Sequence, residues 1–494
     1  MREMEDRRAS IQPIKSKLRL SILDDNDIRA IDETALKILD DVGVHMPLEK
    51  ALKIYADAGA KVDFSNQIVR IPADLVKKSM AKAPRHFVLA GRDRPELDLK
   101  LDGQSGTYFN NGGSTASTID FVTRQERRSC KDDVAKMAKI VDYLPIISLC
   151  WPIVSAADYL KSPMLHELDA CFNNTEKHVE TETVMGEIET KYAIEMASVI
   201  VGGRDRLRER PILSALICGV APLGHDKGGL EATLGFAEGG IPIGYMSMPI
   251  MGTTTPASQA ATLAMGLAEV LSGVGLAQLV NPGCPCYISI IPAVIDPRSG
   301  EYIYSSTSAQ VANAASIQLA HYYGIPTFSG SSFGGSSYAL NTWQVGRENV
   351  YLPLLEVMVG ADMCFSMGVI GDDNLFHPAR VIFDREVFQA VSIISQGLEV
   401  TKDTLLFDTI REVGPRGHFL TQRHTVDNLP KLWSPSILFK KSKEPGKRYE
   451  DPAKLAWEEI HWILENHQVP ELDPKVRNEL KRIIEAAEEE LASR

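Results

Sequence analysis

Apolar residues along this chain gather in eight short runs, and each run closes on a small or polar residue. Between neighbouring runs, apolar residues recur at three- to four-residue spacing, which is typical of an amphipathic helix. Strands separated by helices run parallel, and eight such units close a (β/α)8 barrel. The pattern therefore predicts an α/β fold with its active site at the C-terminal ends of the strands. The runs are Thr107–Gly113, Ile147–Ile153, His178–Glu182, Ile212–Gly219, Pro242–Pro249, Cys286–Ile291, Pro326–Ser332 and Met363–Gly368.

The predicted barrel occupies residues 103–400, and an extension flanks it on each side. The chain has 494 residues, well above the roughly 250 of a bare barrel. In the N-terminal extension, 1–102, helical spacing over 25–60 predicts two packing helices. The mixed segment 67–102 predicts a small cap or β-ribbon over one mouth of the barrel. The C-terminal extension, 401–494, is too polar for a core, so we expect it to pack on the barrel or on a partner subunit.

The net charge of −12 and the pI near 5.5 argue against nucleic acid or an anionic membrane as partner, because both repel an acidic surface. The apolar stretch Pro256–Val280 carries Glu269 and is interpreted as an outer barrel helix. The N-terminus lacks the apolar core of a signal peptide, and the seven cysteines fall mostly inside predicted elements, which indicates reduced thiols in the cytoplasm. Cys284 and Cys286 lack the spacing of a zinc site, so no metal is expected.

The third apolar run places ionisable side chains on one face of a strand. Its period of two puts His178, Glu180 and Glu182 together. A carboxylate inside a barrel is costly unless it meets a cation or hydrogen-bond donors. Glu180 and Glu182 are therefore candidates for facing a cationic group or for transferring a proton. The alternative is a structural pairing with Arg or Lys from a neighbouring element.

Aromatic residues gather at or just beyond the predicted strand ends. Rings around a pocket bind a quaternary ammonium, because each ring face offers negative potential and demands no hydrogen bond. The alternative for any single ring is ordinary packing between barrel and helices. The nearby Gly- and Ser-rich stretch 329–338 lacks the Lys of a P-loop, so nucleotide binding is not expected. The aromatic residues are Tyr108, Phe109, Trp151, Tyr245, Phe328, Phe333, Tyr338, Trp343, Phe365 and Phe376.

Several segments, taken in order and spacing, resemble one known family, the trimethylamine:corrinoid methyltransferases. The resemblance implies a (β/α)8 barrel that moves a methyl group from an amine nitrogen to the cobalt of a separate corrinoid protein. The matching segments are DETALKILDDVGV, TYFNNGGSTASTID, PTFSGSSFGGSSYALNTWQVGRENVYLPLLEVMVGADMCFSMG and HFLTQRHTVDNLPKLW.

The resemblance also bears on the substrate. In the trimethylamine enzymes, pyrrolysine precedes a helix with a Gln and a Glu four residues apart. Gln344 and Glu348 match that pair, whereas the position expected for pyrrolysine, near Tyr338–Leu340, holds ordinary residues. The chain therefore resembles the branch without pyrrolysine, some members of which demethylate glycine betaine and related quaternary amines. A quaternary nitrogen is already alkylated, so the product amine leaves without prior protonation.

On this resemblance the chain is predicted to be a methyltransferase for glycine betaine, carnitine or a related quaternary amine. The methyl acceptor would be a partner corrinoid protein, with no cofactor tightly bound to the chain itself, and a homo-oligomer is expected. Two alternatives are a barrel lyase or hydrolase that uses Glu180 and Glu182 for acid–base catalysis, and a non-catalytic quaternary-amine binding protein.

The resemblance and the residue pattern together assign candidate roles around the predicted site. Glu180 or Glu182 would face the cation. The predicted aromatic box is Tyr108, Phe109, Trp151, Tyr245, Phe333, Tyr338 and Trp343. Hydrogen bonds to a substrate carboxylate would come from Asn110, Asn111, Ser329 and Ser331. Residues facing the corrinoid would be Gln344, Glu348 and His377.

Overall fold

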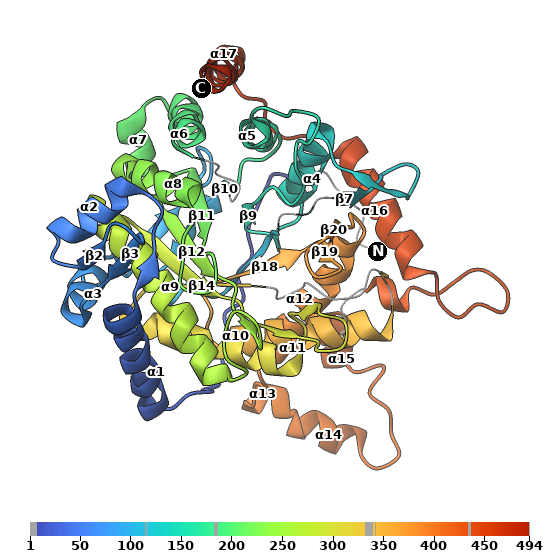
Figure 1. The fold of residues 1–494 in the computed structure, drawn as a ribbon. Coiled ribbons are helices and arrows are strands. Elements are labelled where there is room, and N and C mark those ends of the chain that lie inside the picture. Colours follow the sequence, from blue (N-terminus) through green and yellow to red (C-terminus); the bar gives the residue numbers. More distant parts are fainter. Residues whose placement is uncertain are drawn as a thin grey trace.

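The structure is a computed structural model that describes residues 7–113, 115, 117–181, 186–330, 339–340, 342–432 and 436–493. Eight parallel strands in this part of the chain lie at the centre, with helices around them (Figure 1). The strands are β6 (Tyr108–Asn111), β9 (Leu149–Cys150), β10 (His178–Thr181), β11 (Leu213–Cys218), β12 (Ile243–Ser247), β14 (Cys286–Ile290), β17 (Phe328–Ser329) and β18 (Met363–Met367).

These strands form two arcs that join into one barrel. The arcs have the orders β14-β12-β11-β10-β9 and β17-β18-β6, and every pairing within them is parallel. At one seam the Ile288 amide donates to the Pro326 carbonyl at 3.0 Å, and at the other the Ser148 amide donates to the Phe109 carbonyl at 2.8 Å. The predicted α/β fold with a (β/α)8 barrel is confirmed.

A ring of helices packs against the outside of the barrel. Several of them begin at a side-chain cap, such as Ser258, Ser306 and Thr342, whose hydroxyls accept from backbone amides of the first turn. The helices are α4 (Lys131–Tyr143), α5 (Pro163–Asn174), α6 (Glu187–Val201), α7 (Arg204–Glu209), α8 (Lys227–Gly239), α9 (Gln259–Val280), α10 (Thr307–Tyr323), α11 (Trp343–Val359) and α12 (Arg380–Ser395).

Helix α9 is the one helix of the described residues with the length and apolarity needed to cross a membrane, yet 83% of its most apolar window is buried inside the protein. It packs between the barrel and the N-terminal extension, against α1, α2 and α3. Its apolar composition is therefore explained by its burial between the barrel and the N-terminal extension. It is an outer barrel helix, as the sequence predicted.

The N-terminal extension covers α9 on one side and the N-terminal end of the barrel on the other. A hairpin of β4 and β5 places Leu89, Leu99 and Leu101 in one buried cluster with the barrel residues Leu149 and Tyr287. The elements are α1 (Asp25–Lys37) with the π-helical turn Ile38–Val42, α2 (Glu49–Asp57), α3 (Ala73–Met80), β1 (Val44–His45), β2 (Lys61–Asp63), β3 (Ile68–Arg70), β4 (Phe87–Leu89), the 3-10 helix Pro95–Leu97 and β5 (Leu99–Leu101).

Two small sheets follow the C-terminal ends of the barrel strands. One joins β13 (Ile250–Met251), β15 (Ala293–Ile295) and β16 (Tyr302–Ile303). The other joins β19 (Val369–Ile370), β20 (Leu375–Phe376), β7 (Ser117–Ile119) and β8 (Glu126–Arg128). These strands are two or three residues long, too short to show a hydrophobic period in the sequence.

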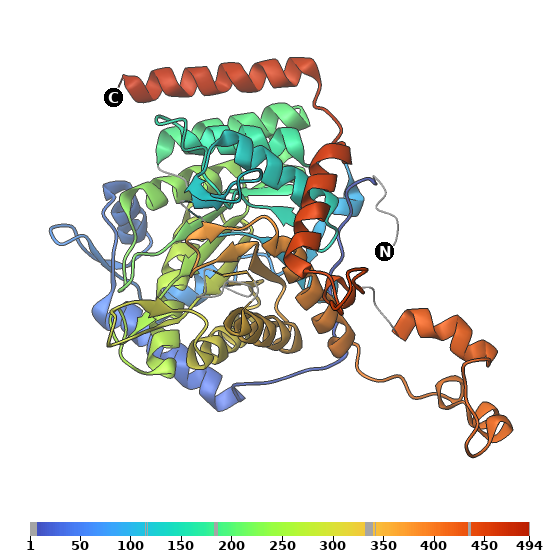
Figure 2. The same ribbon diagram turned by 90° about the vertical axis from the view of Figure 1, so that its right-hand side faces the viewer.

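The C-terminal extension divides into a projecting part and a packed part. Helix α16 packs on α4 and α12, and α17 packs on α6 and α5. The preceding helices project from the body, whereas α17 lies along one side of it (Figure 2). The elements are α13 (Lys402–Leu405), α14 (Phe407–Val413), α15 (Arg423–Leu432), the 3-10 helix Ile437–Phe439, α16 (Pro452–Asn466) and α17 (Pro474–Ala492).

Candidate active site

Glu180 lies inside the barrel, where hydroxyl groups hold it. Its Oε2 accepts from Ser214 Oγ at 3.2 Å and from the Tyr287 hydroxyl in a short hydrogen bond. Ser214 Oγ in turn lies 2.8 Å from His178 Nε2. Burial lowers the pKa of His178 to about 4, so the imidazole is neutral at pH 7. The inward face predicted for His178 and Glu180 is thus observed, and the hydroxyls of Ser214 and Tyr287 both donate to Glu180.

Tyr287 of β14 reaches Glu180 of β10 across β12 and β11, because β12 carries no side chain at the crossing point. Gly244 of β12 pairs with Tyr287, and a Cβ at Gly244 would lie 2.2 Å from the tyrosine ring. Burial and the neighbouring Glu180 charge raise the pKa of Tyr287, so its hydroxyl keeps its proton and remains a donor. Glu182, the other carboxylate predicted on this strand, lies outside the described residues.

Three inward aromatic rings gather in the barrel. Trp151, directly after β9, has its ring centroid 5.6 Å from that of Phe328 and 5.1 Å from that of Phe365, and the two phenylalanines are 4.6 Å apart. All three belong to one buried cluster with Tyr287. We call Trp151, Phe328 and Phe365 the aromatic floor. Trp151 was predicted as part of an aromatic box, and the structure brings it together with two rings that the sequence had placed at strand ends.

Residues at the end of β6 fix the position of Trp151. Asn111 Oδ1 accepts from the Trp151 amide at 3.0 Å, and Asn111 Nδ2 donates to the Trp151 carbonyl at 2.6 Å. At Gly112 a Cβ would lie 2.2 Å from the indole ring, so only glycine allows this approach. Asn111, a predicted carboxylate ligand, therefore has its amide engaged with Trp151. Asn110 differs, because its Oδ1 accepts from the Leu149 amide while its buried Nδ2 has no hydrogen-bond partner in the described structure.

Four of the predicted binding residues lie away from the C-terminal end of the barrel interior. Phe109 packs on Phe388 of α12, and the Tyr245 hydroxyl donates to Thr233 of α8, so both rings lie between strands and helices. Ser329 Oγ bonds to α10 and α11 residues at 2.6 Å. The Tyr108 hydroxyl accepts from the Lys100 amide of the hairpin at the N-terminal end. These positions do not support their predicted contacts with substrate. Phe109, Tyr245 and Ser329 point outward because adjacent strand residues point to opposite faces. Tyr108 points inward, but at the N-terminal end of the barrel.

Three carboxylates converge beyond the C-terminal ends of the strands. Asp372 and Asp373 lie in the turn between β19 and β20, and Glu348 projects from the first turns of α11. Both aspartates have positive φ angles, 48° and 64°, a conformation that Asp tolerates better than most residues. A Cβ at Gly113 would lie 3.4 Å from Asp373 Oδ1. Since Gly112 touches Trp151, this pair of glycines joins the aspartates to the aromatic floor. We call Asp372, Asp373 and Glu348 the acidic mouth.

Burial and like charge act together on Asp372. Burial is the largest cause that raises its pKa to about 7, and the charges of Asp373 and Glu348 add to it. Its Oδ1 is buried without a hydrogen-bond partner in the described structure. Tyr304 is affected by the same charges. Burial and the charge of Asp373 raise the pKa of its hydroxyl. The site therefore favours a cation. Neither aspartate was predicted from the sequence, although the two acids in GDDN, just after the eighth run, were a signal.

The remaining predicted residues lie near the mouth or outside the described structure. Trp343 is 87% exposed at the start of α11, and Gln344 Nε2 donates to Glu348 Oε1 at 3.1 Å. His377 packs against Trp457 of α16 with ring centroids 5.5 Å apart, and burial lowers its pKa to about 4. Ser331, Phe333 and Tyr338 lie outside the described residues, as does Glu182.

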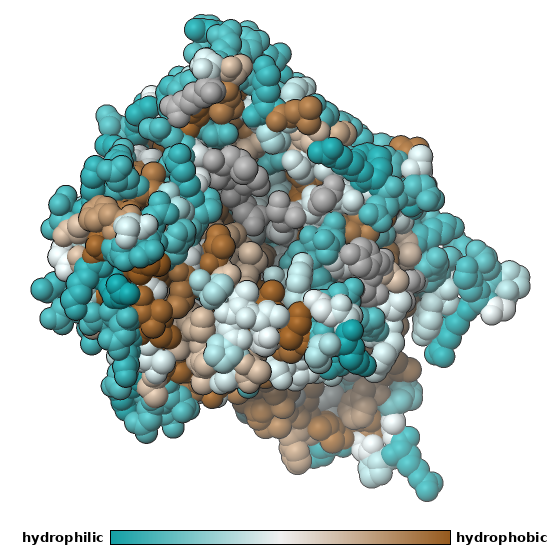
Figure 3. Space-filling model, viewed as in Figure 1, coloured by the Kyte–Doolittle hydropathy of each residue, from teal (hydrophilic) through white to brown (hydrophobic). Residues whose placement is uncertain are grey.

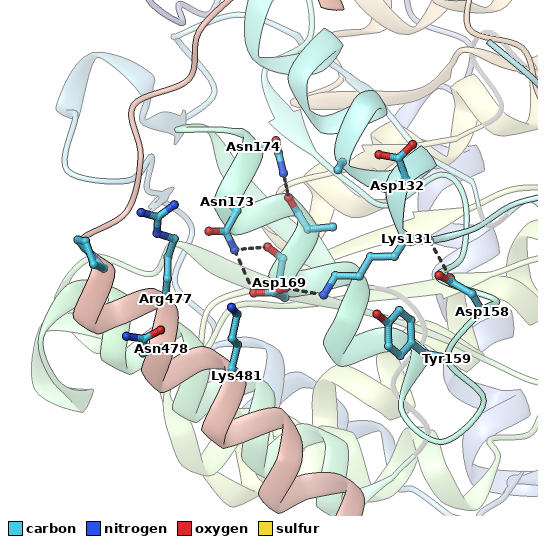
Figure 4. A pocket seen from close by; sticks show the side chains of 13 residues that line it. Lys131, Asp132, Asp158, Tyr159, Asp169, Asn173, Asn174, Arg477, Asn478 and Lys481 are labelled. Carbon is cyan, nitrogen blue, oxygen red and sulfur yellow. Dashed lines mark hydrogen bonds and ion pairs between the residues drawn. The ribbon is translucent and has the colours of Figure 1, made fainter. Parts of the chain in front are cut away.

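A pocket of about 620 Å³ lies on the outside of the barrel, between α4, α5 and α17 (Figure 4). Its charges balance, because three cations (Lys131, Arg477 and Lys481) and three carboxylates (Asp132, Asp158 and Asp169) line it, and Lys131 Nζ lies 2.6 Å from Asp169. None of the predicted site residues lines it. Within the described residues no group of three or more His, Cys, Asp or Glu side chains is placed to hold a metal ion. The barrel end therefore remains the candidate site.

The chain matches one known protein family along nearly its whole length. The sequence model described as trimethylamine methyltransferase (MTTB) matches residues 2–492. The chain belongs to the trimethylamine methyltransferase family. It is 30% identical to trimethylamine methyltransferase MttB of Desulfitobacterium hafniense strain DSM 10664 / DCB-2 over 434 residues, which cover 87% of this chain and 86% of that protein. The match to glycine betaine methyltransferase of D. hafniense strain Y51 is 28% over 425 residues, covering 84% of this chain and 87% of that protein.

Among solved structures, monomethylamine methyltransferase of Methanosarcina barkeri aligns over 91% of this chain and 95% of its own, with 13% identity and a TM-score of 0.47. The family predicted from the sequence is confirmed, and the protein is a methyltransferase. Its sequence holds ordinary residues throughout, as in the branch without pyrrolysine. Neither the lyase or hydrolase alternative nor the binding-only alternative is supported.

Proposed function

We propose that this methyltransferase takes a methyl group from a quaternary amine such as glycine betaine and passes it to the Co(I) corrinoid of a separate protein. The observation that carries the proposal is the family match over residues 2–492. One curated relative is named for trimethylamine and another for glycine betaine, so the substrate class is a choice between a tertiary and a quaternary amine. The acidic mouth and the aromatic floor favour a methylated ammonium ion over a neutral or anionic substrate.

A quaternary ammonium offers no N–H group, so charge and ring faces are the interactions left to recognise it. The acidic mouth supplies charge through Asp372, Asp373 and Glu348. Trp151, which Gly112 and Gly113 link to the mouth, supplies a ring, and Phe365 packs against it. The electrostatic gain is larger in a partly buried site than in water, since the effective dielectric is lower there. Binding a cation would also favour the ionised form of Asp372.

The product of demethylation is a neutral tertiary amine, which departs without a proton. A general acid is therefore unnecessary, and Glu180, engaged by Ser214 and Tyr287, need not supply one. The corrinoid supplies the nucleophile when the partner protein is bound. The residues of this chain hold the N–CH3 bond in place and exclude water, which is the contribution of proximity and orientation. Exposed Trp343 and Gln344, beside the mouth, are proposed to meet the partner.

The test is methyl transfer from glycine betaine, proline betaine or carnitine to a reduced corrinoid protein or free cob(I)alamin. Transfer is followed by the absorbance change of the cobalt centre. We expect transfer from at least one quaternary amine and none from trimethylamine. Transfer from trimethylamine alone would overturn the substrate class, and inertness of all four would overturn the reaction.

Asn110 is proposed to donate its amide to the carboxylate of a betaine, because its Nδ2 is buried in the barrel without a partner in the described structure. In Asn110→Ala we expect the dissociation constant for glycine betaine to rise by about 10- to 100-fold, the effect of losing a hydrogen bond to a charged group. Isothermal titration of the variant measures it.

Choline serves as the matched control for this variant, because it is a quaternary amine without a carboxylate. Its dissociation constant is expected to stay within about threefold of the wild-type value, a change of less than 1 kcal/mol. An equal loss for both ligands would show that Asn110 acts through the Leu149 amide and the strand pairing, and would remove it from the binding site.

A further inference from the structure

The segment 397–436, which we call the arm, leaves the body of the protein and returns to it. Gln396 donates to the Lys15 carbonyl just before the arm, and the Ile437 amide donates to Glu386 just after it. Between these anchors, α13, α14 and α15 contain no buried residue in the part of the arm that the structure describes. Figure 2 shows these helices projecting away from the barrel.

The arm exposes an unusual number of large apolar side chains. Each of them is between 40% and 89% exposed. Soluble monomers rarely expose apolar patches larger than a few hundred Å², and helices as short as α14 and α15 are marginal in water without packing. The arm therefore needs another surface to cover it. The side chains are Leu398, Val400, Leu405, Phe407, Ile410, Phe419, Leu420, Val426, Leu429 and Leu432.

The arm starts at the end of the barrel opposite the candidate active site. Ser395, the last residue of α12, accepts from the Lys17 amide at 2.8 Å. Ile14, three residues before Lys17, pairs with Thr107 directly before β6. This is the N-terminal end of the strands, whereas a methyl acceptor must reach the acidic mouth at the C-terminal end. The surface that covers the arm is therefore not the corrinoid protein engaged in methyl transfer.

The apolar surface continues from the arm onto the body of the same chain. Ile393 and Ile394 at the end of α12 are 60% and 44% exposed, and Tyr351 on the adjacent α11 is 55% exposed. In a two-fold dimer each surface patch meets the same patch on the other copy. Such a contact would bring each arm onto the α11–α12 face of the other copy.

Charge and size also fit a second copy. The arm contains five Lys and Arg residues and five Asp and Glu residues, so the whole net charge of −12 lies on the rest of the chain. A neutral arm meets another acidic copy without the repulsion that two acidic faces would suffer. A standard interface takes roughly 20–30 residues from each partner, and the arm alone spans more than that.

We propose that the arm is a dimerisation element that packs on the α11–α12 face of a second copy of this chain. The two copies are related by a two-fold axis, and their acidic mouths remain open to the partner protein at the far ends. The contact is apolar, so dimer formation is expected to persist at high salt.

Sedimentation velocity of the full chain, across a wide range of concentration, tests the proposal. The wild-type protein is expected to sediment at twice the 54.4 kDa chain mass. In Leu405→Asp/Phe407→Asp/Ile410→Asp we expect the dissociation constant of the dimer to rise by at least about 100-fold. The matched control is Val122→Asp/Leu160→Asp/Val220→Asp, which places the same charges on exposed apolar residues of loops at the C-terminal end and should leave the dimer intact.

Amide hydrogen exchange over residues 402–432 identifies the contact itself. Protection in the wild type should rise with protein concentration, and in the arm variant it should stay low while the barrel amides keep theirs. A wild-type protein that sediments as a monomer at every concentration would refute the dimer. An arm variant that remains dimeric would show that the dimer contact lies elsewhere on the chain. Arm protection that appears only when the corrinoid protein is added would show that the corrinoid protein, not a second copy, covers the arm. No step of this test depends on the substrate.

Discussion

Asp372→Asn/Glu348→Gln is expected to lower kcat/KM for a quaternary amine by about 100- to 1,000-fold. The substitutions keep the shapes of the side chains and remove two of the three charges of the acidic mouth. Losing the partners of a partly buried cation costs about 2–5 kcal/mol, and the stated range corresponds to about 2.7–4.1 kcal/mol. Initial rates of methyl transfer at several substrate concentrations measure the effect. Most of it should appear in KM, because the carboxylates bind the cation before and during transfer.

The pH dependence gives the same hypothesis a second readout. The pKa of Asp372 is raised to about 7, mainly by burial, so the carboxyl gains a proton as the pH falls through that value. Protonation removes a charge that attracts the cation. KM is therefore expected to rise as the pH is lowered below about 7 and to be constant above it. In Asp372→Asn alone this dependence should disappear.

Stability should move in the opposite direction from activity. A carboxyl whose pKa is higher in the folded protein than in the unfolded chain opposes folding when the pH is above the folded value. Asp372→Asn is thus expected to leave the free energy of unfolding in urea at pH 8 unchanged or to raise it.

The matched control for the kcat/KM of the double mouth variant is Glu49→Gln/Asp132→Asn, which neutralises two exposed carboxylates on α2 and α4. A double mouth variant that keeps kcat/KM within threefold of this control would remove the acidic mouth from substrate binding.

The sequence predicted the barrel because strand and helix periods are properties of neighbouring residues. All eight runs became barrel strands, and the inward face of His178 and Glu180 followed from the period of two. The same period limits the aromatic box, since Tyr108 and Phe109 are adjacent and only one can face inward. To predict the side-chain directions of Tyr245 and Ser329, one must know which of the two alternating sets of strand residues faces the barrel interior. That choice depends on packing with helices such as α8 and α11, which are distant in sequence.

The acidic mouth was beyond the reach of periodicity for a different reason. Asp372 and Asp373 lie on a turn between two strands of two residues each, and Glu348 comes from the next helix back along the chain. Their convergence depends on the barrel closing β18 against β6, which brings Gly113 next to Asp373. A sequence pattern shows acids near a strand end, but the closure of the barrel decides which of them share one electrostatic field.

Lys177→Met is expected to destabilise the protein by about 3–5 kcal/mol, the cost of removing one partner from a buried charged network. The Lys177 ammonium is completely buried and donates to the carbonyls of Val141, Leu144 and Ile147 at 2.6, 2.8 and 2.5 Å. All three N–H donors of the Lys177 amine are used, and they satisfy backbone carbonyls at and just after the C-terminal end of α4. Methionine fills a similar volume but leaves the three carbonyls without this donor. Urea unfolding followed by circular dichroism measures the change.

Because of Asp142, the loss of stability expected for Lys177→Met is larger than the loss of the hydrogen bonds at the end of α4 alone would cause. Its carboxylate accepts from Thr175, from the Glu176 amide and from His467, directly after α16. Its charge opposes the burial that lowers the pKa of Lys177 to about 7. Lys191→Met, which removes an exposed amine paired with Glu490, is expected to cost less than about 1 kcal/mol. Equal effects of the two variants would mean that the buried ammonium contributes no more than a surface charge. A large difference would show that the N-terminal end of the barrel, opposite the acidic mouth, is held by a polar network that joins α4, the start of β10 and the end of α16.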